Sequence, residues 1–250
     1  MRKIIPVLIS VALLALSGCA STPDKPLTVK QMYAKADRSL KVGNYGVAAQ
    51  QFRDLQARYP FGDYAVQAHL DLIYALYLND KPDECAEEAE RFIRENPRHP
   101  NVDYAYFMRA LAYFVKPSYL EGLFGVDTAK KDVANARKSF QYFQLLVQSY
   151  PDSQFAPDAR QRMVFLRNYL ARHEMFVADY YMRRGAFIAA TQRANYVLSH
   201  YQDSQSAPRA LWVLEQAYRQ LKLDDLAEDA ARLRKTNYPD WTYQPLPEGF

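Results

Sequence analysis

The sequence predicts an all-α protein built from about five repeated pairs of helices. Five similar helix endings follow one another along the chain, at spacings of 37, 54, 51 and 37 residues. No stretch alternates apolar and polar residues with the β-branched enrichment of a sheet. The endings are Tyr59-Pro60, Asn96-Pro97, Tyr150-Pro151, Tyr201-Gln202 and Tyr238-Pro239.

A common helical face precedes each ending. Small residues lie twelve positions before the second residue of each ending, namely Ala48, Cys85, Ser139, Ala190 and Ala227. Four and seven positions later come Phe52 and Leu55, Ala89 and Phe92, Phe143 and Leu146, Ala194 and Val197, and Ala231 and Arg234. These steps place the side chains on one face, small where a neighbouring helix crosses. The pattern resembles the tetratricopeptide repeat, whose period is about 34 residues, and predicts a superhelix in which Cys85 is a small packing residue.

The third and fourth repeats carry insertions of about 15 residues beyond the short spacing. The first, at 116–131, contains helix breakers and predicts a loop. The second, Met163 to Arg183, is continuous and predicts a lengthened or additional helix. Two nearly identical connections, at 150–157 and 201–208, predict Asp or Ser as the helix cap and Pro in the first turn.

The N-terminus resembles a bacterial lipoprotein signal. Arg2 and Lys3 precede a short apolar run, too short to span a membrane, which ends in Leu16-Ser17-Gly18-Cys19. We expect cleavage before Cys19, then S-diacylglycerol and N-acyl groups on that residue. An ordinary secretory signal with an incidental cysteine is the alternative. Ala20, where an aspartate would favour inner-membrane retention, indicates the inner leaflet of the outer membrane, with the body facing the periplasm.

The predicted organisation follows from these segments. Residues 1–18 form the cleaved signal peptide, and 19–28 the lipidated cysteine and a tether. Residues 29–153 hold repeats one to three, and 154–240 hold repeats four and five. The tail at 241–250 receives no role. With Cys19 lipidated, Cys85 has no partner for an intramolecular disulfide in an oxidising compartment.

The sequence offers little support for catalysis, for metal binding or for nucleic-acid binding. The net charge of +4 falls to about +2 without Arg2 and Lys3, which is too weak a bias to indicate nucleic acid. The four histidines are scattered, and no HExxH motif or Cys/His cluster has zinc spacing. The glycines of 122–125 lack the strand and basic residue of a phosphate site. We therefore expect no enzyme, no metal and no cofactor beyond the lipid.

Eight short motifs extend the resemblance over roughly residues 28 to 235. They are RYPFG at 58–62, LDLIYA at 70–75, RFIR at 91–94, NP at 96–97, HPNVDY at 99–104, FGVD at 124–127, VFL at 164–166 and RGA at 184–186. In order and spacing, the chain resembles the BamD family of lipoproteins, which belong to the β-barrel assembly machinery of the outer membrane.

This resemblance implies a non-enzymatic adapter with five repeats. The N-terminal repeats would face unfolded outer-membrane β-barrel proteins, with Arg58, Tyr59, Phe61 and Tyr64 as candidate contacts. Tyr59 has a structural alternative, because an aromatic recurs at the other endings.

The C-terminal repeats would dock the membrane-proximal POTRA domain of the barrel-forming subunit BamA. Arg184 and Arg193 are the candidates for this contact, and a solvated charge is the alternative for each. Phe124 and Asp127 in the inserted loop could serve another Bam lipoprotein.

A cell-wall protein is the competing interpretation. It would be either an adapter that binds peptidoglycan or a helical murein-cleaving enzyme. The lack of catalytic carboxylates in a sugar-sized cleft argues against the enzyme. Basic and aromatic surfaces can hold glycans, so the sequence leaves a wall-binding role open.

Overall fold

A computed structural model describes residues 26–115 and 133–245, and within these ranges it contains ten α-helices and no strand. The predicted signal peptide, Cys19, the inserted loop with Phe124 and Asp127, and the end of the tail lie outside the described residues. The helices are α2 (Val29–Lys41), α3 (Tyr45–Arg58), α4 (Asp63–Leu78), α5 (Pro82–Glu95), α6 (Val102–Ala112), α8 (Ala134–Ser149), α9 (Ala156–Arg183), α10 (Phe187–His200), α11 (Ala207–Gln220) and α12 (Asp224–Asn237).

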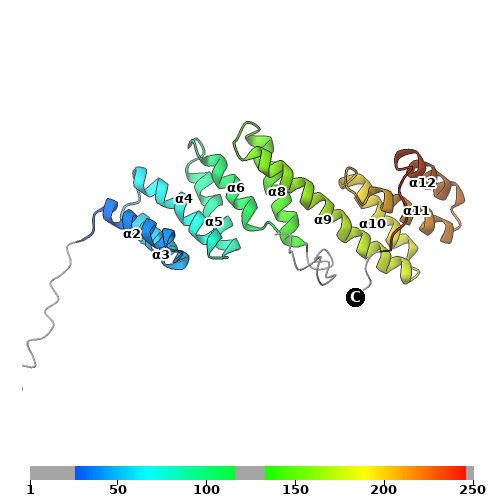
Figure 1. The fold of residues 1–250 in the computed structure, drawn as a ribbon, viewed down its shortest axis with the longest axis horizontal. Helices are drawn as coiled ribbons and strands as arrows, with labels where there is room; N and C mark the ends of the chain where they lie inside the picture. Colours follow the sequence, from blue (N-terminus) through cyan, green and yellow to red (C-terminus); the bar gives the residue numbers. More distant parts are fainter. Residues whose placement is uncertain (1–25, 116–132, 246–250) are drawn as a thin grey trace, which may run out of the picture.

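The helices stack as consecutive pairs in an elongated array (Figure 1). Each helix packs mainly against the helices before and after it along the chain. The pairs α2/α3, α4/α5, α6/α8, α9/α10 and α11/α12 form units one to five, and the protein is an all-α tetratricopeptide-repeat superhelix. Because contacts are local, each unit buries its apolar face against its neighbours, as repeat proteins do.

The five predicted endings all terminate the second helix of a unit. Tyr59, Asn96, Tyr150, Tyr201 and Tyr238 are the C-cap residues of α3, α5, α8, α10 and α12. Each donates its backbone N–H to the carbonyl four residues earlier, at N···O distances of 2.7 to 2.8 Å. The helix face predicted from the sequence is also confirmed, since its apolar members are buried. Arg234 is the charged residue on this face, at the position where the other units have an apolar side chain. Its guanidinium donates to Glu215 Oε2 at 2.8 Å.

A left-handed residue closes the turn inside units one, two, four and five. Gly43 and Gly185 have φ of 84° and 70°, and Asp80 and Lys222 have φ of 55° and 59° at the matching positions of units two and five. Glycine adopts this conformation at no steric cost, which explains its use in two of these turns. The turn geometry is thus repeated more closely than the sequence that builds it.

Two predictions about the fourth unit have different outcomes. The lengthened helix is confirmed, because α9 is a single helix of 28 residues. Pro157 and Pro208 lie in the first turns of α9 and α11, as predicted, but capping by Asp or Ser side chains is wrong. The N-cap residues are Phe155 and Ser206, and neither makes a side-chain cap. The Ser153 hydroxyl accepts from the Phe155 backbone N–H at 3.1 Å, outside the helix, and donates to Asp103 Oδ2 at 2.6 Å, in unit three.

Cys85 is fully buried, as predicted for a packing residue. Its Sγ lies 3.4 Å from the carbonyl oxygen of Ile73, and burial raises the pKa of the thiol to about 12. None of the described helices is both long enough and apolar enough to cross a membrane.

Candidate interaction surfaces

The turn between α3 and α4 presents the most exposed aromatic side chain of the described residues. Phe61 is 90% exposed, and Gly62 beside it has φ of 96° and is the N-cap of α4. The Phe61 ring borders a hollow of about 640 Å³ between α3, α4 and α5. Burial of a phenylalanine contributes roughly 1.5–3 kcal/mol, so this exposed ring adds little to the stability of the chain and is accessible to a partner.

The inner wall of this hollow is polar and internally paired. His69 is 3% exposed, and its Nε2 lies 3.2 Å from Glu88 Oε2. Arg91 Nη2 donates to the same carboxylate oxygen at 2.5 Å. Burial alone would raise the pKa of Glu88, but the hydrogen bond from His69 and the charge of Arg91 outweigh it and lower the pKa. His69, Glu88 and Arg91 are thus paired with one another, and the Phe61 ring at the rim of the hollow is accessible to a partner.

Tyr64 lines a different hollow from Phe61. It is 37% exposed, and its ring centroid lies 5.4 Å from that of Tyr33 on α2. The two tyrosines border a hollow of about 440 Å³ that also reaches His99. Tyr33 donates its hydroxyl to Asp71 Oδ2 at 2.6 Å, and burial together with this bond raises the tyrosine pKa. The structure thus places two of the predicted substrate contacts on separate surfaces either side of one turn.

The other two candidates at this turn differ in role. Tyr59 donates its hydroxyl to the carbonyl oxygen of Leu27 at 3.1 Å, so its side chain holds the segment that enters α2. This favours the structural alternative for Tyr59. Arg58 is exposed at the last position of α3 and remains available to a carboxylate.

The predicted docking arginines also differ in their surroundings. Arg184 is exposed at the end of α9, with its guanidinium carbon 5.1 Å from the Tyr180 ring centroid. Arg193 donates to Glu174 Oε2 at 3.1 Å, and Glu174 is 3% exposed. Arg137 Nη2 lies 3.7 Å from the other oxygen of the same carboxylate. Arg193 therefore compensates a buried charge within the chain, which leaves Arg184 as the freer cation.

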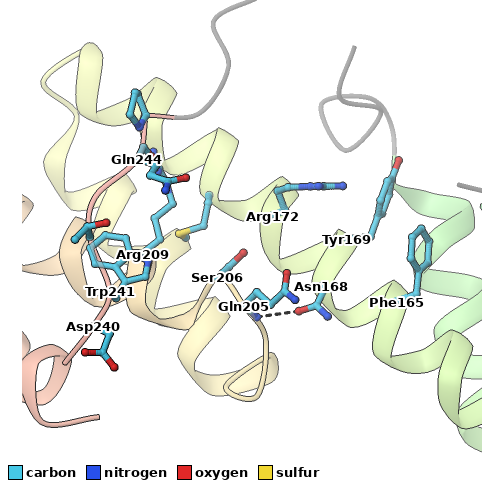
Figure 2. Close-up of a pocket in the computed structure, with 13 residues that line it drawn as sticks. Phe165, Asn168, Tyr169, Arg172, Gln205, Ser206, Arg209, Asp240, Trp241 and Gln244 are labelled. Atoms are coloured by element: carbon cyan, nitrogen blue, oxygen red, sulfur yellow. Dashed lines mark hydrogen bonds between the residues drawn. The ribbon is translucent and has the colours of Figure 1, made fainter. Parts of the chain in front are cut away.

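A further hollow was not predicted from the sequence. It measures about 930 Å³ and lies between α9, the start of α11 and the segment that follows α12 (Figure 2). That segment, residues 239–245, is here called the strap. Phe165, Asn168 and Tyr169 of α9 face the hollow, and Trp241 and Gln244 belong to the strap. The only sequence signal was the pair of aromatics at alternate positions, Trp241 and Tyr243.

The described residues contain no group of three or more His, Cys, Asp or Glu side chains that could hold a metal ion. The surfaces above are lined by aromatic, amide and arginine side chains, which suit the binding of polypeptide. The model of the YfiO family, described as an outer membrane lipoprotein, matches residues 25–233.

This chain belongs to that outer membrane lipoprotein family. Its curated relatives include proteins named outer membrane protein assembly factor BamD. The one from Neisseria gonorrhoeae is 40% identical over 93% of this chain and 91% of its own length. Those from Vibrio cholerae and Haemophilus influenzae are 38% and 31% identical, over 90% and 98% of this chain and 95% of their own lengths. The matched family region ends before the strap begins.

Proposed function

We propose that this lipoprotein is a non-enzymatic assembly factor for β-barrel proteins of the outer membrane. In this proposal the N-terminal repeats hold unfolded barrel segments and the C-terminal repeats dock on the barrel-forming subunit, BamA, beside other lipoproteins of the complex. The observation that carries it is the 40% identity, over nearly the whole chain, to a protein named as such an assembly factor.

The lipid anchor would fix how far the repeats stand from the membrane. Helix α2 begins at Val29 and is capped by Thr28, whose side chain accepts from the Gln31 backbone N–H. Nine residues separate Cys19 from Val29. A fully extended chain spans at most about 3.5 Å per residue, so the start of α2 would lie within about 35 Å of the bilayer surface. Phe61, on the turn that leaves unit one, would thus be close to where barrels insert.

Phe61 suits the proposed substrate because barrel strands alternate apolar with polar residues and carry aromatics at both interfaces. An unfolded strand also has unpaired backbone groups and aggregates through its edges. Contact with an exposed aromatic ring would favour capture of such segments without requiring one sequence.

Site-specific crosslinking tests the substrate contact. A photoreactive phenylalanine analogue at Phe61 should crosslink to an unfolded barrel precursor, and one at Ile188 should not. Ile188 is a matched control because it is 64% exposed but lies on α10, in unit four. Phe61→Ala should then reduce crosslinking from a probe at Glu95, which lines the same hollow as Phe61. Equal crosslinking from Phe61 and Ile188 would show that the N-terminal surface is not the substrate site.

Charge reversal tests the docking contact. Arg184→Glu should reduce the amount of BamA that co-purifies with the lipoprotein in mild detergent, because a forked guanidinium suits an acidic partner surface. Arg38→Glu is the control, since Arg38 is exposed on α2 at the other end of the array. Unchanged recovery of BamA with Arg184→Glu would place the docking face elsewhere. Recovery of murein alone from the unaltered protein would refute the assembly function and favour the cell-wall alternative.

A further inference from the structure

The strap lies over the first helices of units four and five. Helices α9 and α11 contact one another, and the strap begins with a turn at the end of α12 and then crosses them (Figure 2). It makes no helix or strand of its own. Its position is therefore set by side chains of the helices beneath it, as a bound peptide's would be.

A buried arginine holds the main chain of the strap. Arg209 on α11 is 7% exposed, and its Nη1 donates to the carbonyl oxygen of Gln244 at 2.5 Å. Its Nη2 donates to Asp179 Oδ2, also at 2.5 Å, and this carboxylate on α9 fixes the guanidinium. A bond to a backbone carbonyl does not depend on which side chain the peptide carries. Arg209 could therefore bind any extended segment of similar register.

Aromatic contacts hold the strap side chains. The Tyr243 ring stacks on Trp212, with centroids 4.1 Å apart and planes at 25°. The Arg209 guanidinium carbon lies 5.2 Å from the Tyr243 centroid, and that of Arg234 lies 5.7 Å from Trp241. Stacking and cation–π contacts of this kind are each worth about 0.5–1.5 kcal/mol. Trp241 therefore contacts α12, and Tyr243 contacts α11.

The strap covers only part of the surface it binds. Among the described residues, the hollow of about 930 Å³ continues beside the strap along α9, where the half-buried Phe165 ring, which stacks on the buried Tyr169, provides further aromatic surface. Tyr243 itself is 45% exposed. A segment that is half in water and held by a few contacts can exchange, and the open hollow gives a competing chain room to enter.

We propose that this face is a second peptide-binding groove, occupied in cis by the strap, and that an extended segment of another polypeptide displaces it. The segment would carry aromatic residues at alternate positions and offer a backbone carbonyl to Arg209. This goes beyond the proposed function, because it does not require the Phe61 surface to bind anything. The strap then competes with the free segment for the groove and raises the concentration of segment needed for binding.

The size of the competition follows from the tether. The strap is joined directly to α12, so its effective concentration at the groove is on the order of 1 mM. If the free segment binds an open groove with a Kd of about 10 μM, the strap weakens its apparent binding about 100-fold. If the strap binds the groove more weakly than this, the apparent binding of the free segment is reduced by less. We expect at least a tenfold difference in its Kd between the closed and the open groove.

Fluorescence anisotropy with the strap sequence itself tests this. The probe is a labelled peptide of residues 239–245, and the proteins are the full chain and a variant ending at Asp240. The shortened variant should bind the peptide at least tenfold more tightly than the full chain. A peptide with Trp241→Ala and Tyr243→Ala should bind neither. The proposal is overturned if the shortened variant does not bind the probe, or if both proteins bind it equally.

Two further variants separate binding from folding. If truncation impairs folding, the full chain with Trp241→Ala and Tyr243→Ala keeps its length and should bind the probe more tightly than the unaltered chain. In the opened protein, Arg209→Lys should weaken binding about tenfold, because one ammonium cannot serve Asp179 and a peptide carbonyl with the geometry of the fork. Arg219→Lys, on the exposed side of α11, is its control and should leave binding unchanged.

The remaining outcomes are also decisive. A truncation that lowers the melting temperature without creating peptide binding would show that the strap is only a brace, and would overturn the proposal. A full chain that dimerises through exchanged straps, seen by size-exclusion chromatography with light scattering, would replace the proposed partner with a second copy of this chain. Loss of crosslinking at Phe61 would leave the groove proposal intact, so the two proposals fail separately.

Discussion

Replacing Arg193 should destabilise the C-terminal units because it leaves a buried carboxylate short of a partner. The Glu174 side chain is 3% exposed. Its Oε2 lies 3.1 Å from Arg193 Nη1, and its Oε1 lies 3.7 Å from Arg137 Nη2. Removing one partner of a fully buried ion pair costs about 3–5 kcal/mol. Arg193 is 45% exposed and Arg137 remains, so solvent screening reduces the expected cost of Arg193→Ala to about 2 kcal/mol. Arg193→Glu adds like-charge repulsion and should cost about 3 kcal/mol.

Urea unfolding followed by circular dichroism measures this cost. With a dependence of about 2 kcal/mol per molar urea, Arg193→Ala should lower the midpoint by about 1 M and Arg193→Glu by somewhat more. Arg184→Glu should change it by less than about 0.3 M, since that side chain is exposed and pairs with no buried acid. An unchanged midpoint for Arg193→Glu would refute the reasoning. If the cost is found, weakened BamA recovery by Arg193→Glu would report on folding as much as on docking.

Three other predictions concern the body of the array. Cys85, whose pKa burial raises to about 12, should not react with a thiol reagent at pH 8 until urea unfolds the chain, and fast labelling of the native protein would contradict its burial. Phe143→Ala should cost about 3–5 kcal/mol in urea unfolding, because the ring is fully buried against Phe107 and Phe114; a cost below about 1 kcal/mol would be inconsistent with that packing. The lowered pKa of Glu88 contributes stability that is present above its ordinary value of 4.5 and is lost as the pH falls below it, so Glu88→Gln should flatten the acid side of the stability curve; an unchanged acid limb would exclude this contribution.

The repeat was predictable because its signals are local. A tyrosine or asparagine ends each of the five helices through a backbone bond to the preceding turn, and proline follows it in four of the five. The small residues of the repeated face follow from helix periodicity alone. The same local logic found the length of α9, whose second half contains no helix breaker.

The capping and the sites depend on residues far apart in the chain, and there sequence reasoning was incomplete. Ser153 was expected to cap α9, but it bonds to Asp103, 50 positions away. The partner of Arg193 lies 19 positions earlier, on another helix. Arg209 and Gln244 are 35 positions apart with no repeating pattern between them, so the strap could not be placed before the fold was known. Phe61 was identified because its motif is contiguous.

Helix α9 has a mechanical consequence. At 1.5 Å per residue its 28 residues form a rod about 42 Å long, packed against α8 at one side and against α10 and α11 at the other. A rigid rod converts rotation into displacement, so tilting its first turn by about 5° moves its far end by about 4 Å. That distance approaches the spacing of neighbouring strands in a sheet, about 4.8 Å. A small rotation at the N-terminal end of α9 would therefore displace the C-terminal repeats by a distance of this size.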